Sequence, residues 1–591
     1  MKKSTIIIAL AAALLFAFAA CEGPAGPQGP KGEPGNNGSQ NPNNPQGLTT
    51  LSAAYAYLMA AEGGDSVANP VTIAVSMDLG VMGYATEWHL LLAVIGRAGK
   101  FISLDLSDCT MIGTVFSAYT TSPYGKDKIV SLILPAAAKL VAGFFSNPSD
   151  GSYTNMTFCS GANITSIGMM TFFDCLALQS VSFPLATSIG NSSFYGCTAL
   201  QSVSFPLVTS IGDSAFAGCT ALQSVSFPAA ENIGWRSFED CTALQSVSFP
   251  VVQSIGTFMD YGYGTEFISE AFYGCTALES VSFPVAQSIG NSAFSGCTAL
   301  QSVSFPVAQS IGISVFTDCT ALQSVSFPLV KSIGAFVDYG YGTIFVSSAF
   351  SGCTALENVS FPLVQSIGEF SFEGCTALQS ITIPATADIE AGAFARCTSL
   401  VSFIVTGSGP LDVIEGGKAL VRNNTELVAY PAASGTITMS TITSFDYKAF
   451  SFCTTLQSVS FPALQSIGDY FFSGCTALES VSFPAAQSIG RDAFYHCIAL
   501  HSVNIPSVTN IDSHAFGDTA TAMTVTMGNP APTVGSYIFS DPHEVAKSVT
   551  VRVPAAAVAS YNTAWQNAFL GLGSDGTGWV NSNITLTIET Y

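Results

Sequence analysis

The sequence contains few charged residues, and basic residues are the scarcest among them. Charged residues make up 9% of the 591 positions, and 17 Lys and Arg oppose 39 Asp and Glu, which leaves a net charge of −22. A chain this acidic repels phosphate backbones, so we expect no nucleic-acid partner. Hydrophobic residues make up 48% of the chain, which excludes disorder over most of its length.

Motifs that carry chemistry are also lacking. No Cys-x-x-Cys pair is present for a zinc ribbon, and there is neither a P-loop nor a Gly-x-Gly-x-x-Gly turn after a strand. The scattered Asp and Glu form no dense ligand loop of the kind that calcium favours. We therefore predict no catalytic residues, no metal site and no cofactor, and we do not expect an enzyme.

Three small groups of residues were considered as exceptions. His496 and His501 could form a loose metal pair, but their repeat positions place them on different faces. Residues 512–514, Asp-Ser-His, are adjacent in sequence, whereas the members of a catalytic triad normally converge from distant segments. Asp260 and Asp338 could at most bind a cation weakly.

The N-terminus has the features of an export signal. Lys2 and Lys3 precede an apolar run from Ile6 to Ala20 that is too short to span a bilayer. The small residues before Cys21 resemble a bacterial lipoprotein signal, which implies that Cys21 becomes the first mature residue and carries acyl chains. The alternative is ordinary secretion, in which residues 1–20 are removed and the Cys is coincidental.

A collagen-like linker follows, and with the lipidated Cys it covers residues 21–47. Residues 23–40 read as six triplets that begin with Gly, and four of them contain Pro. This is the triple-helix pattern, since only Gly fits at the crowded axis. The segment is either an extended spacer, which we favour, or a trimerising stalk.

The body of the chain is built from a 22-residue repeat. A repeat of this length predicts a solenoid, in which each coil contacts only its neighbours. Longer gaps after Cys241, Cys319 and Cys397 interrupt the otherwise even spacing. Cysteines mark the repeat at Cys175, Cys197, Cys219, Cys241, Cys275, Cys297, Cys319, Cys353, Cys375, Cys397, Cys453, Cys475 and Cys497.

One unit, 197–218, shows how a coil is built. Residues 202–205 alternate between polar and apolar side chains, which predicts a short strand, and Pro206 then ends the ladder because it has no N–H to donate. Ile211 and Phe216 supply further apolar side chains. Each coil has too few of them to bury a core alone, so stacked coils share one continuous core and the terminal coils need caps.

The unit L-x-S-V-x-F-P-x4-S-I-G-x2-A-F-x2-C resembles the BspA-like leucine-rich repeat family of bacterial surface proteins. The resemblance implies an α/β repeat: a curved leucine-rich-repeat solenoid with parallel strands on its concave face and a cap at each end. It covers residues 151–518, with an irregular unit at about 401–450. Residues 48–150 are expected to hold a helical cap and degenerate repeats, and residues 519–591 degenerate repeats and the closing cap.

Two surfaces are candidates for ligand binding. The first is the neutral strand face, whose hydroxyls and amides could bond an extended polypeptide or a glycan or could simply suit strand stacking; it is represented by Gln201, Ser202, Ser204, Gln223, Ser224 and Ser226. The second comprises two insertions that lengthen a coil by twelve residues each and lie within 257–269 and 335–347; their aromatics either bind a ligand or pad the edge of the solenoid. These aromatics are Phe258, Tyr261, Tyr263, Phe267, Phe336, Tyr339, Tyr341 and Phe345.

Nearly all of the 16 cysteines occupy one slot of the repeat. Such a slot usually holds a small buried residue, and a free Cys packs as a small hydrophobe. We therefore favour free buried thiols, although adjacent coils lie near the Cα spacing that a disulfide needs.

The resemblance implies a binding function at the bacterial surface. We expect a lipid-anchored protein of the outer membrane or cell surface that adheres to a host matrix or serum protein or to another microbe. A structural role in the envelope or biofilm, and capture of a glycan or nutrient, are the alternatives.

Overall fold

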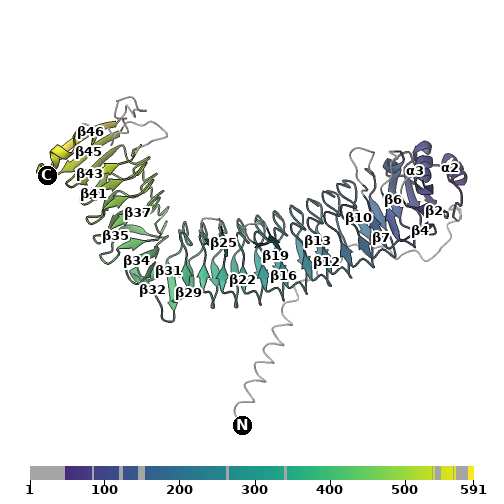
Figure 1. The fold of residues 1–591 in the computed structure, drawn as a ribbon, viewed down its shortest axis with the longest axis horizontal. Coiled ribbons are helices and arrows are strands. Elements are labelled where there is room, and N and C mark those ends of the chain that lie inside the picture. The colour runs from purple at the N-terminus through teal and green to yellow at the C-terminus, as the bar shows by residue number, and fades with distance from the viewer. Residues whose placement is uncertain are drawn as a thin grey trace, which may run out of the picture.

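The computed structural model describes residues 47–82, 86–118, 124–143, 145, 153–260, 265–338, 343–446, 448–450, 452–535, 537–539, 547–562, 565–566 and 584–591. Cys21 and the linker lie outside these residues. The described chain forms a long stack of coils that is bent into an arc, with helices at its N-terminal end (Figure 1). The structure therefore confirms a curved solenoid of parallel strands with few helices.

Two helices lie at the N-terminal end. Helix α2 (Leu51–Ala60) begins at Thr50, whose hydroxyl accepts a hydrogen bond from the N–H of Ala53 at 3.2 Å. Helix α3 (Glu87–Ala98) ends at Gly99, which has a left-handed conformation with φ of 69°. Short strands β2 (Asp78–Val81) and β4 (Thr110–Ile112) pair beside them, and a 3₁₀ turn, η1 (Lys126–Lys128), follows.

The longer strand of each coil builds the first sheet. Strands of neighbouring coils pair in parallel at equivalent positions of the repeat, as in Ser224 with Ser246, and the pairing continues across an insertion, as in Ser246 with Ser280. Its strands form three runs along the stack, and single backbone bridges through Ser202 join the first two. The runs are β1 (Val71–Ala74), β3 (Ile102–Asp105), β6 (Ile129–Ile133), β8 (Phe158–Ser160) and β10 (Ser180–Ser182); then β13 (Ser224–Ser226), β15 (Ser246–Ser248), β19 (Ser280–Ser282), β21 (Ser302–Ser304), β23 (Ser324–Ser326) and β27 (Asn358–Ser360); then the pair β29 (Ser380–Pro384) and β31 (Ser402–Thr406).

The Ser-Ile dipeptides of most coils build a second parallel sheet, which the sequence does not predict. Twelve of these short strands pair side by side, as in Ser188 with Ser210 and Ile189 with Ile211. They are β5 (Val115–Ser117), β7 (Leu140–Ala142), β9 (Ser166–Ile167), β11 (Ser188–Ile189), β12 (Ser210–Ile211), β14 (Asn232–Ile233), β16 (Ser254–Ile255), β20 (Ser288–Ile289), β22 (Ser310–Ile311), β24 (Ser332–Ile333), β28 (Ser366–Ile367) and β30 (Asp388–Ile389).

An irregular unit interrupts both sheets. Strands β32 (Leu411–Ile414), β33 (Ala419–Arg422) and β34 (Glu426–Ala429) are antiparallel, η2 (Glu415–Gly417) joins the first two, and β36 (Ser444–Phe445) pairs with β34 in parallel. The buried core divides into two clusters at this unit, and the arc turns there (Figure 1).

The stack then resumes with the same two sheets. The first sheet continues as β35 (Ser434–Thr438), β37 (Thr455–Ser460), β39 (Ser480–Ser482), β41 (Ser502–Ile505), β43 (Ala522–Met527), β45 (Lys547–Val553) and β46 (Ile584–Thr590). The second sheet continues as β38 (Ser466–Ile467), β40 (Ser488–Ile489), β42 (Asn510–Ile511) and β44 (Thr533–Val534). After the 3₁₀ turn η3 (Ala555–Ser560), Tyr561 and Trp565 pack against the end of the core.

The third side of each coil is a turn segment without helix. Its backbone bonds to the next coil: the N–H groups of Ser214, Phe216 and Gly218 donate to the carbonyls of Trp235, Ser237 and Glu239 at 2.7–2.8 Å. Two residues of each segment, such as Ser214 (φ 51°) and Gly218 (φ 73°), have left-handed conformations that a helix cannot accommodate. The segment therefore adds a third ladder to the two sheets.

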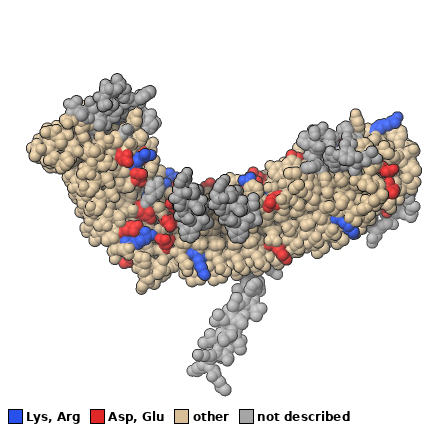
Figure 2. Space-filling model, viewed as in Figure 1, with Lys and Arg blue, Asp and Glu red and all other residues tan. Residues whose placement is uncertain are grey.

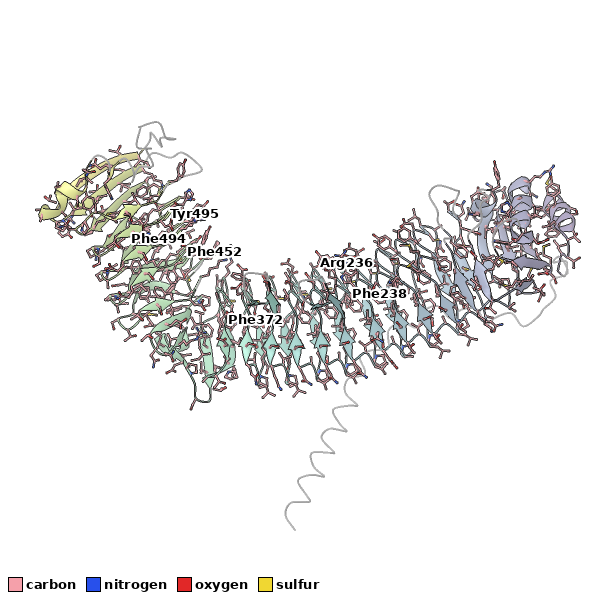
Figure 3. The ribbon with its side chains drawn as sticks, in the orientation of Figure 1. Arg236, Phe238, Phe372, Phe452, Phe494 and Tyr495 are labelled. Atoms are coloured by element: carbon pink, nitrogen blue, oxygen red, sulfur yellow. The ribbon has the colours of Figure 1, made fainter. Side chains whose placement is uncertain are left out.

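Phenylalanines fill the core in two stacked columns. Phe216 and Phe238 stack with ring centroids 5.2 Å apart and planes 5° from parallel, and neighbouring coils repeat the contact. Phe227 belongs to the second column and meets Phe238 at a tilt of 56°. These offset and tilted contacts are the geometries that aromatic rings favour. Figure 3 shows Phe238, Phe372 and Phe494 inside the stack.

All fifteen cysteines within the described residues are free and buried. In most regular coils the thiol donates a hydrogen bond to the carbonyl of a Phe in the preceding coil, as Cys219 does to Phe194 at 3.1 Å. Burial raises the pKa of Cys297 to about 12 and raises that of Cys275 well above the ordinary value of 9.0. The thiols thus act as small hydrophobes with one satisfied donor, as the favoured interpretation had it.

This burial predicts a loss of stability at high pH. A thiol of raised pKa stays protonated in the folded chain after the unfolded chain has ionised, so its contribution is complete below pH 9.0 and is lost as the pH rises toward about 12 for Cys297. Denaturant titrations of residues 48–591 should show a free energy of unfolding that falls above pH 9.0. Cys297→Ala should reduce that slope by up to about 1.4 kcal/mol per pH unit. If the free energy of unfolding of Cys297→Ala fell with pH as steeply as that of the unaltered protein, ionisation of Cys297 on unfolding would not explain the loss.

In one left-handed column of the turn segments, each aspartate is followed by two glycines from Asp174 to Gly374. Asp174 has a φ of 52°, and its Oδ1 would overlap with a Cβ placed on Gly196. Gly218 follows in the next coil with the same left-handed backbone, yet a Cβ there would meet nothing closer than 3.6 Å. Glycine is therefore favoured at position 196 by the left-handed backbone and by the lack of room for a Cβ, and at position 218 by the left-handed backbone alone.

We predict that Gly196→Ala destabilises the protein more than Gly218→Ala does. Both changes place a Cβ on a left-handed residue, at a cost of about 1 to 2 kcal/mol. Only the first also clashes with Asp174, which adds about 1 to 3 kcal/mol. Thermal and denaturant unfolding of the two variants measures the difference, and Asp174→Gly should bring Gly196→Ala back to the stability of Gly218→Ala. Equal losses in the two single variants would refute the clash.

Candidate binding surfaces

The six candidate residues of the strand face are all exposed. They alternate with buried Val203 and Val225, which point into the core from the same segments. Along this face hydroxyls of successive coils can bond one another, as Ser458 and Ser480 do at 2.7 Å. The position of these residues on the concave side of the arc, and their role in binding, remain predictions. The six are Gln201, Ser202, Ser204, Gln223, Ser224 and Ser226.

The two insertions form antiparallel hairpins. Strands β17 (Thr257–Asp260) and β18 (Thr265–Ile268) pair in one, and β25 (Ala335–Asp338) and β26 (Thr343–Val346) pair in the other with the same register. The backbones of Phe258 and Phe267 are paired across the first hairpin, and those of Phe336 and Phe345 across the second. The side chains of these four residues lie outside the described atoms, as do Tyr261, Tyr263, Tyr339 and Tyr341 altogether.

The turn segments carry a surface that the sequence interpretation had not considered. In Figure 3 the labelled turn residues Arg236, Phe452 and Tyr495 lie toward the inner side of the arc, whereas Phe238 and Phe494 lie deeper in the stack. The exposed positions of these segments differ in residue type from coil to coil, as Tyr195, Asp318 and Arg396 show. Large side chains on this surface are therefore departures that occur in some coils only.

One such departure lies beside the first hairpin, and we name it the Trp235 patch. The guanidinium of Arg236 lies 4.3 Å from the centre of the Trp235 ring, contacts the carboxylate of Glu270, and lies 3.6 Å from an oxygen of Glu239. Burial raises the pKa of Glu239, and the carboxylates of Asp240 and Glu270 add to the effect, while Arg236 opposes it. The patch comprises Trp235, Arg236, Glu239, Asp240, Glu270 and Tyr273.

The Trp235 patch could have been found by aligning the three-coil block with its copy. At the offset that superimposes the two insertions in the sequence, Trp235 corresponds to Ile313 and Arg236 to Ser314. A search for repeated motifs misses such a site, because it keeps the residues that the coils share and discards those that occur in one coil only.

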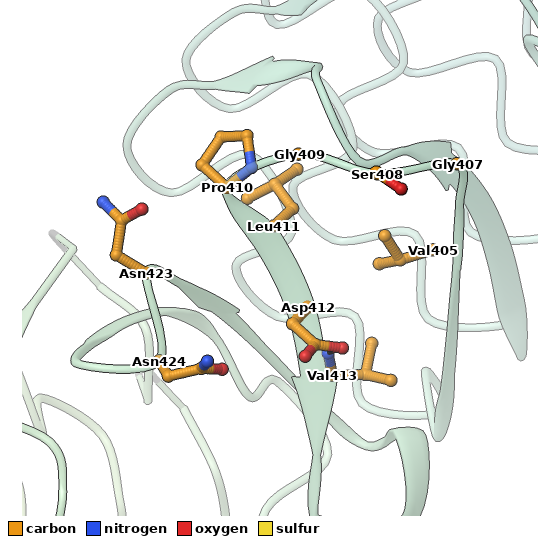
Figure 4. Close-up of a pocket in the computed structure, with 10 residues that line it drawn as sticks. All are labelled: Val405, Gly407, Ser408, Gly409, Pro410, Leu411, Asp412, Val413, Asn423 and Asn424. Carbon is orange, nitrogen blue, oxygen red and sulfur yellow. Dashed lines mark hydrogen bonds between the residues drawn. The ribbon is translucent and has the colours of Figure 1, made fainter.

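Charged side chains also gather at the bend of the arc, around the irregular unit (Figure 2). Arg422 on β33 donates to the carbonyl of Ile389 at 2.9 Å and pairs with Glu426 at 2.9 Å, so it ties the irregular unit to the preceding coil. A cleft of about 520 Å³ lies next to this region and opens between β31 and β32 (Figure 4). Val405 and Val413 line it from the two strands, together with the exposed Asp412.

The remaining candidate motifs do not assemble a reactive centre among the described side chains. His496 pairs with Asp518 of the next coil, while the ring of His501 lies against the backbone carbonyl of Ala499. The carboxylate of Asp512 accepts the N–H of Ser513, and His514 stacks on Tyr537. No group of three metal-binding side chains was found within the described ranges, where only the backbones of Asp260 and Asp338 are placed.

No described helix is both long enough and apolar enough to cross a membrane. Among the curated proteins, no sequence matches this chain.

Several solved structures resemble the chain. A leucine-rich cell surface protein from Faecalibacterium prausnitzii is 25% identical over 52% of this chain and 82% of its own, with a TM-score of 0.42. A leucine-rich repeat protein from Bacteroides ovatus is 18% identical over 78% of this chain and 92% of its own, with a TM-score of 0.34. The pneumococcal vaccine antigen PcpA is 13% identical over 81% of this chain and 90% of its own, with a TM-score of 0.28.

A family model decides the assignment. The model for the BspA type leucine rich repeat region matches residues 143–262, 265–339, 342–416 and 432–546, which together exceed half of the chain. These ranges cover most of the stacked coils and all four hairpin strands. The chain therefore belongs to the BspA type leucine-rich repeat family of bacterial surface proteins.

Proposed function

We propose that this protein is an adhesin of the bacterial surface that binds a protein of the host matrix or serum, or the surface of another microbe. The observation that carries the proposal is the pair of hairpins, β17–β18 and β25–β26. They leave an otherwise regular stack at equivalent positions three coils apart, so two copies of one feature are presented side by side. Duplicated sites on a rigid scaffold are suited to multivalent binding.

The N-terminal segment supports attachment to the membrane. A signal at residues 1–20, lipidation of Cys21 and the linker that ends at residue 47 would hold the solenoid at a distance from the lipid. Acyl chains contribute about 0.8 kcal/mol for each buried CH₂, so several chains anchor a protein firmly. The outer membrane or cell surface is the location that this arrangement and the family favour.

The test is binding by the soluble ectodomain, residues 48–591, with and without the hairpins. Removing 257–268 and 335–346 joins Gly256 to Ser269 and Gly334 to Ser347, which restores the 22-residue period in both coils. The shortened protein should therefore keep its fold. Its binding to immobilised fibronectin, fibrinogen and laminin at physiological salt should fall by about tenfold or more if the hairpins hold the ligand.

The other results separate the remaining functions. Saturable binding to glycans alone would replace adhesion to protein by glycan capture, which the exposed hydroxyls and amides of the strand face could support. Binding to none of the proteins or glycans would leave a structural role in the envelope. Circular dichroism and the melting temperature of the shortened protein serve as controls for folding.

A further inference from the structure

The two hairpins provide an internal comparison, because the coils at their bases descend from the same duplicated block. The coil before the first hairpin carries Trp235 and Asp240, and the coil before the second carries Ile313 and Asp318 at the same positions. Any residue that the hairpin needs for its own support should therefore be present at both bases. A side chain that is present beside one hairpin and absent beside the other therefore indicates a role other than support of the hairpin.

The backbones of the two bases are equivalent. The N–H of Trp235 donates to Asp213 at 2.9 Å, and the N–H of Ile313 donates to Asn291 at 2.9 Å. The N–H of Asp240 donates to the carbonyl of Tyr273 at 2.8 Å, as that of Asp318 does to Ser351.

The left-handed residues agree as well. Arg236 has a φ of 55° where Ser314 has 53°, and Asp240 has 55° where Asp318 has 58°. Both aspartates also lie over the glycine of the next coil in the same way. The fold therefore accepts either set of side chains.

The side chains differ sharply. The first base has Trp235, Arg236, Glu239, Glu270 and Tyr273, whereas the second has Ile313, Ser314, Thr317, Ser348 and Ser351. Trp is present only four times in the chain, and charged residues make up only 9% of it. One scarce Trp and three charged side chains are thus concentrated at one base, and the second base shows that a hairpin of the same register does not require them.

The Trp235 patch has the composition of a recognition surface. Trp, Tyr and Arg are the residues most enriched among those that dominate binding energy at protein interfaces. Tyr273 is 42% exposed, so its ring is open to a partner.

We propose that the Trp235 patch is a docking surface for a protein segment that carries arginine or lysine side chains. This inference rests on the proposed function, since it assigns the protein partner a chemistry and a place on the solenoid. The carboxylates of Glu239 and Glu270 lie against the single guanidinium of Arg236, and Asp240 acts on Glu239 as a third negative charge, so the patch has a net charge of −2 before a partner binds. A cation from the partner would relieve the mutual repulsion of Glu239, Asp240 and Glu270 and could pack against the exposed ring of Tyr273.

The test exchanges the two bases. In one variant the first base receives the residues of the second, by Trp235→Ile, Arg236→Ser, Glu239→Thr, Glu270→Ser and Tyr273→Ser. In the reciprocal variant the second base receives the patch, by Ile313→Trp, Ser314→Arg, Thr317→Glu, Ser348→Glu and Ser351→Tyr. The chain already accommodates each residue at the equivalent position, so both variants should fold.

The probes are a short Gly–Ser peptide that carries arginines and its counterpart with glutamates, each followed by fluorescence anisotropy with residues 48–591. The arginine peptide should bind, the first variant should weaken that binding by about tenfold, and the reciprocal variant should double the number of peptides bound. The glutamate peptide should not bind. Equal binding of the two peptides, or arginine-peptide binding that the first variant leaves unchanged, would overturn the proposal.

The matrix proteins separate this inference from the proposed function. If fibronectin, fibrinogen or laminin binds and the first variant binds it equally well, the docking surface is wrong and adhesion stands. If none of them binds while the arginine peptide still depends on the patch, adhesion to these proteins is wrong and the docking surface stands.

Discussion

The in-register hydrogen bonding of one coil to the next is the constraint on which the rest of the structure depends. Ser188 pairs with Ser210 and Ser210 with Asn232, so a given position of the repeat always meets itself one coil further on. Turn segments obey the same register through their own ladder. The side chains of the regular coils consequently form columns, and in the core and on the strand face most neighbours in a column are the same residue type or a close substitute.

This constraint explains the unusual composition. A column of phenylalanines gains stacking energy in every coil, and a column of thiols gains one hydrogen bond in each. A column of like charges would repel at every step, because facing like charges on neighbouring strands destabilise a sheet. The low content of charge and the neutral Gln and Ser of the strand face are therefore consequences of stacking. Charges gather where the register is broken, as around Arg422 at the bend.

The sequence predicts those parts of the fold that are repeated and misjudges those that are short or unique. The cysteine spacing gives the period of the stack, and the alternation at 202–205 gives the first sheet. The second sheet is not predicted, because two residues such as Ser210–Ile211 are too few to show alternation and pair only with their counterparts in other coils. The turn segments contain no helix because residues such as Ser214 adopt a left-handed conformation that nothing in their own side chains signals.

The candidate sites also divide into a repeated one, which the sequence predicts, and a unique one, which it does not. The strand face could be named from the sequence because it recurs, yet for that reason it offers each coil the same weak contacts and gives a ligand no preferred position. Specific recognition on a stack requires a place where columns differ from their neighbours. Trp235 and Arg236 are such a place. The equivalent residues are Asp213 and Ser214 in the preceding coil and Ser269 and Glu270 in the following coil. In a solenoid of this kind, the residues that depart from the repeat are the ones that can determine its partner.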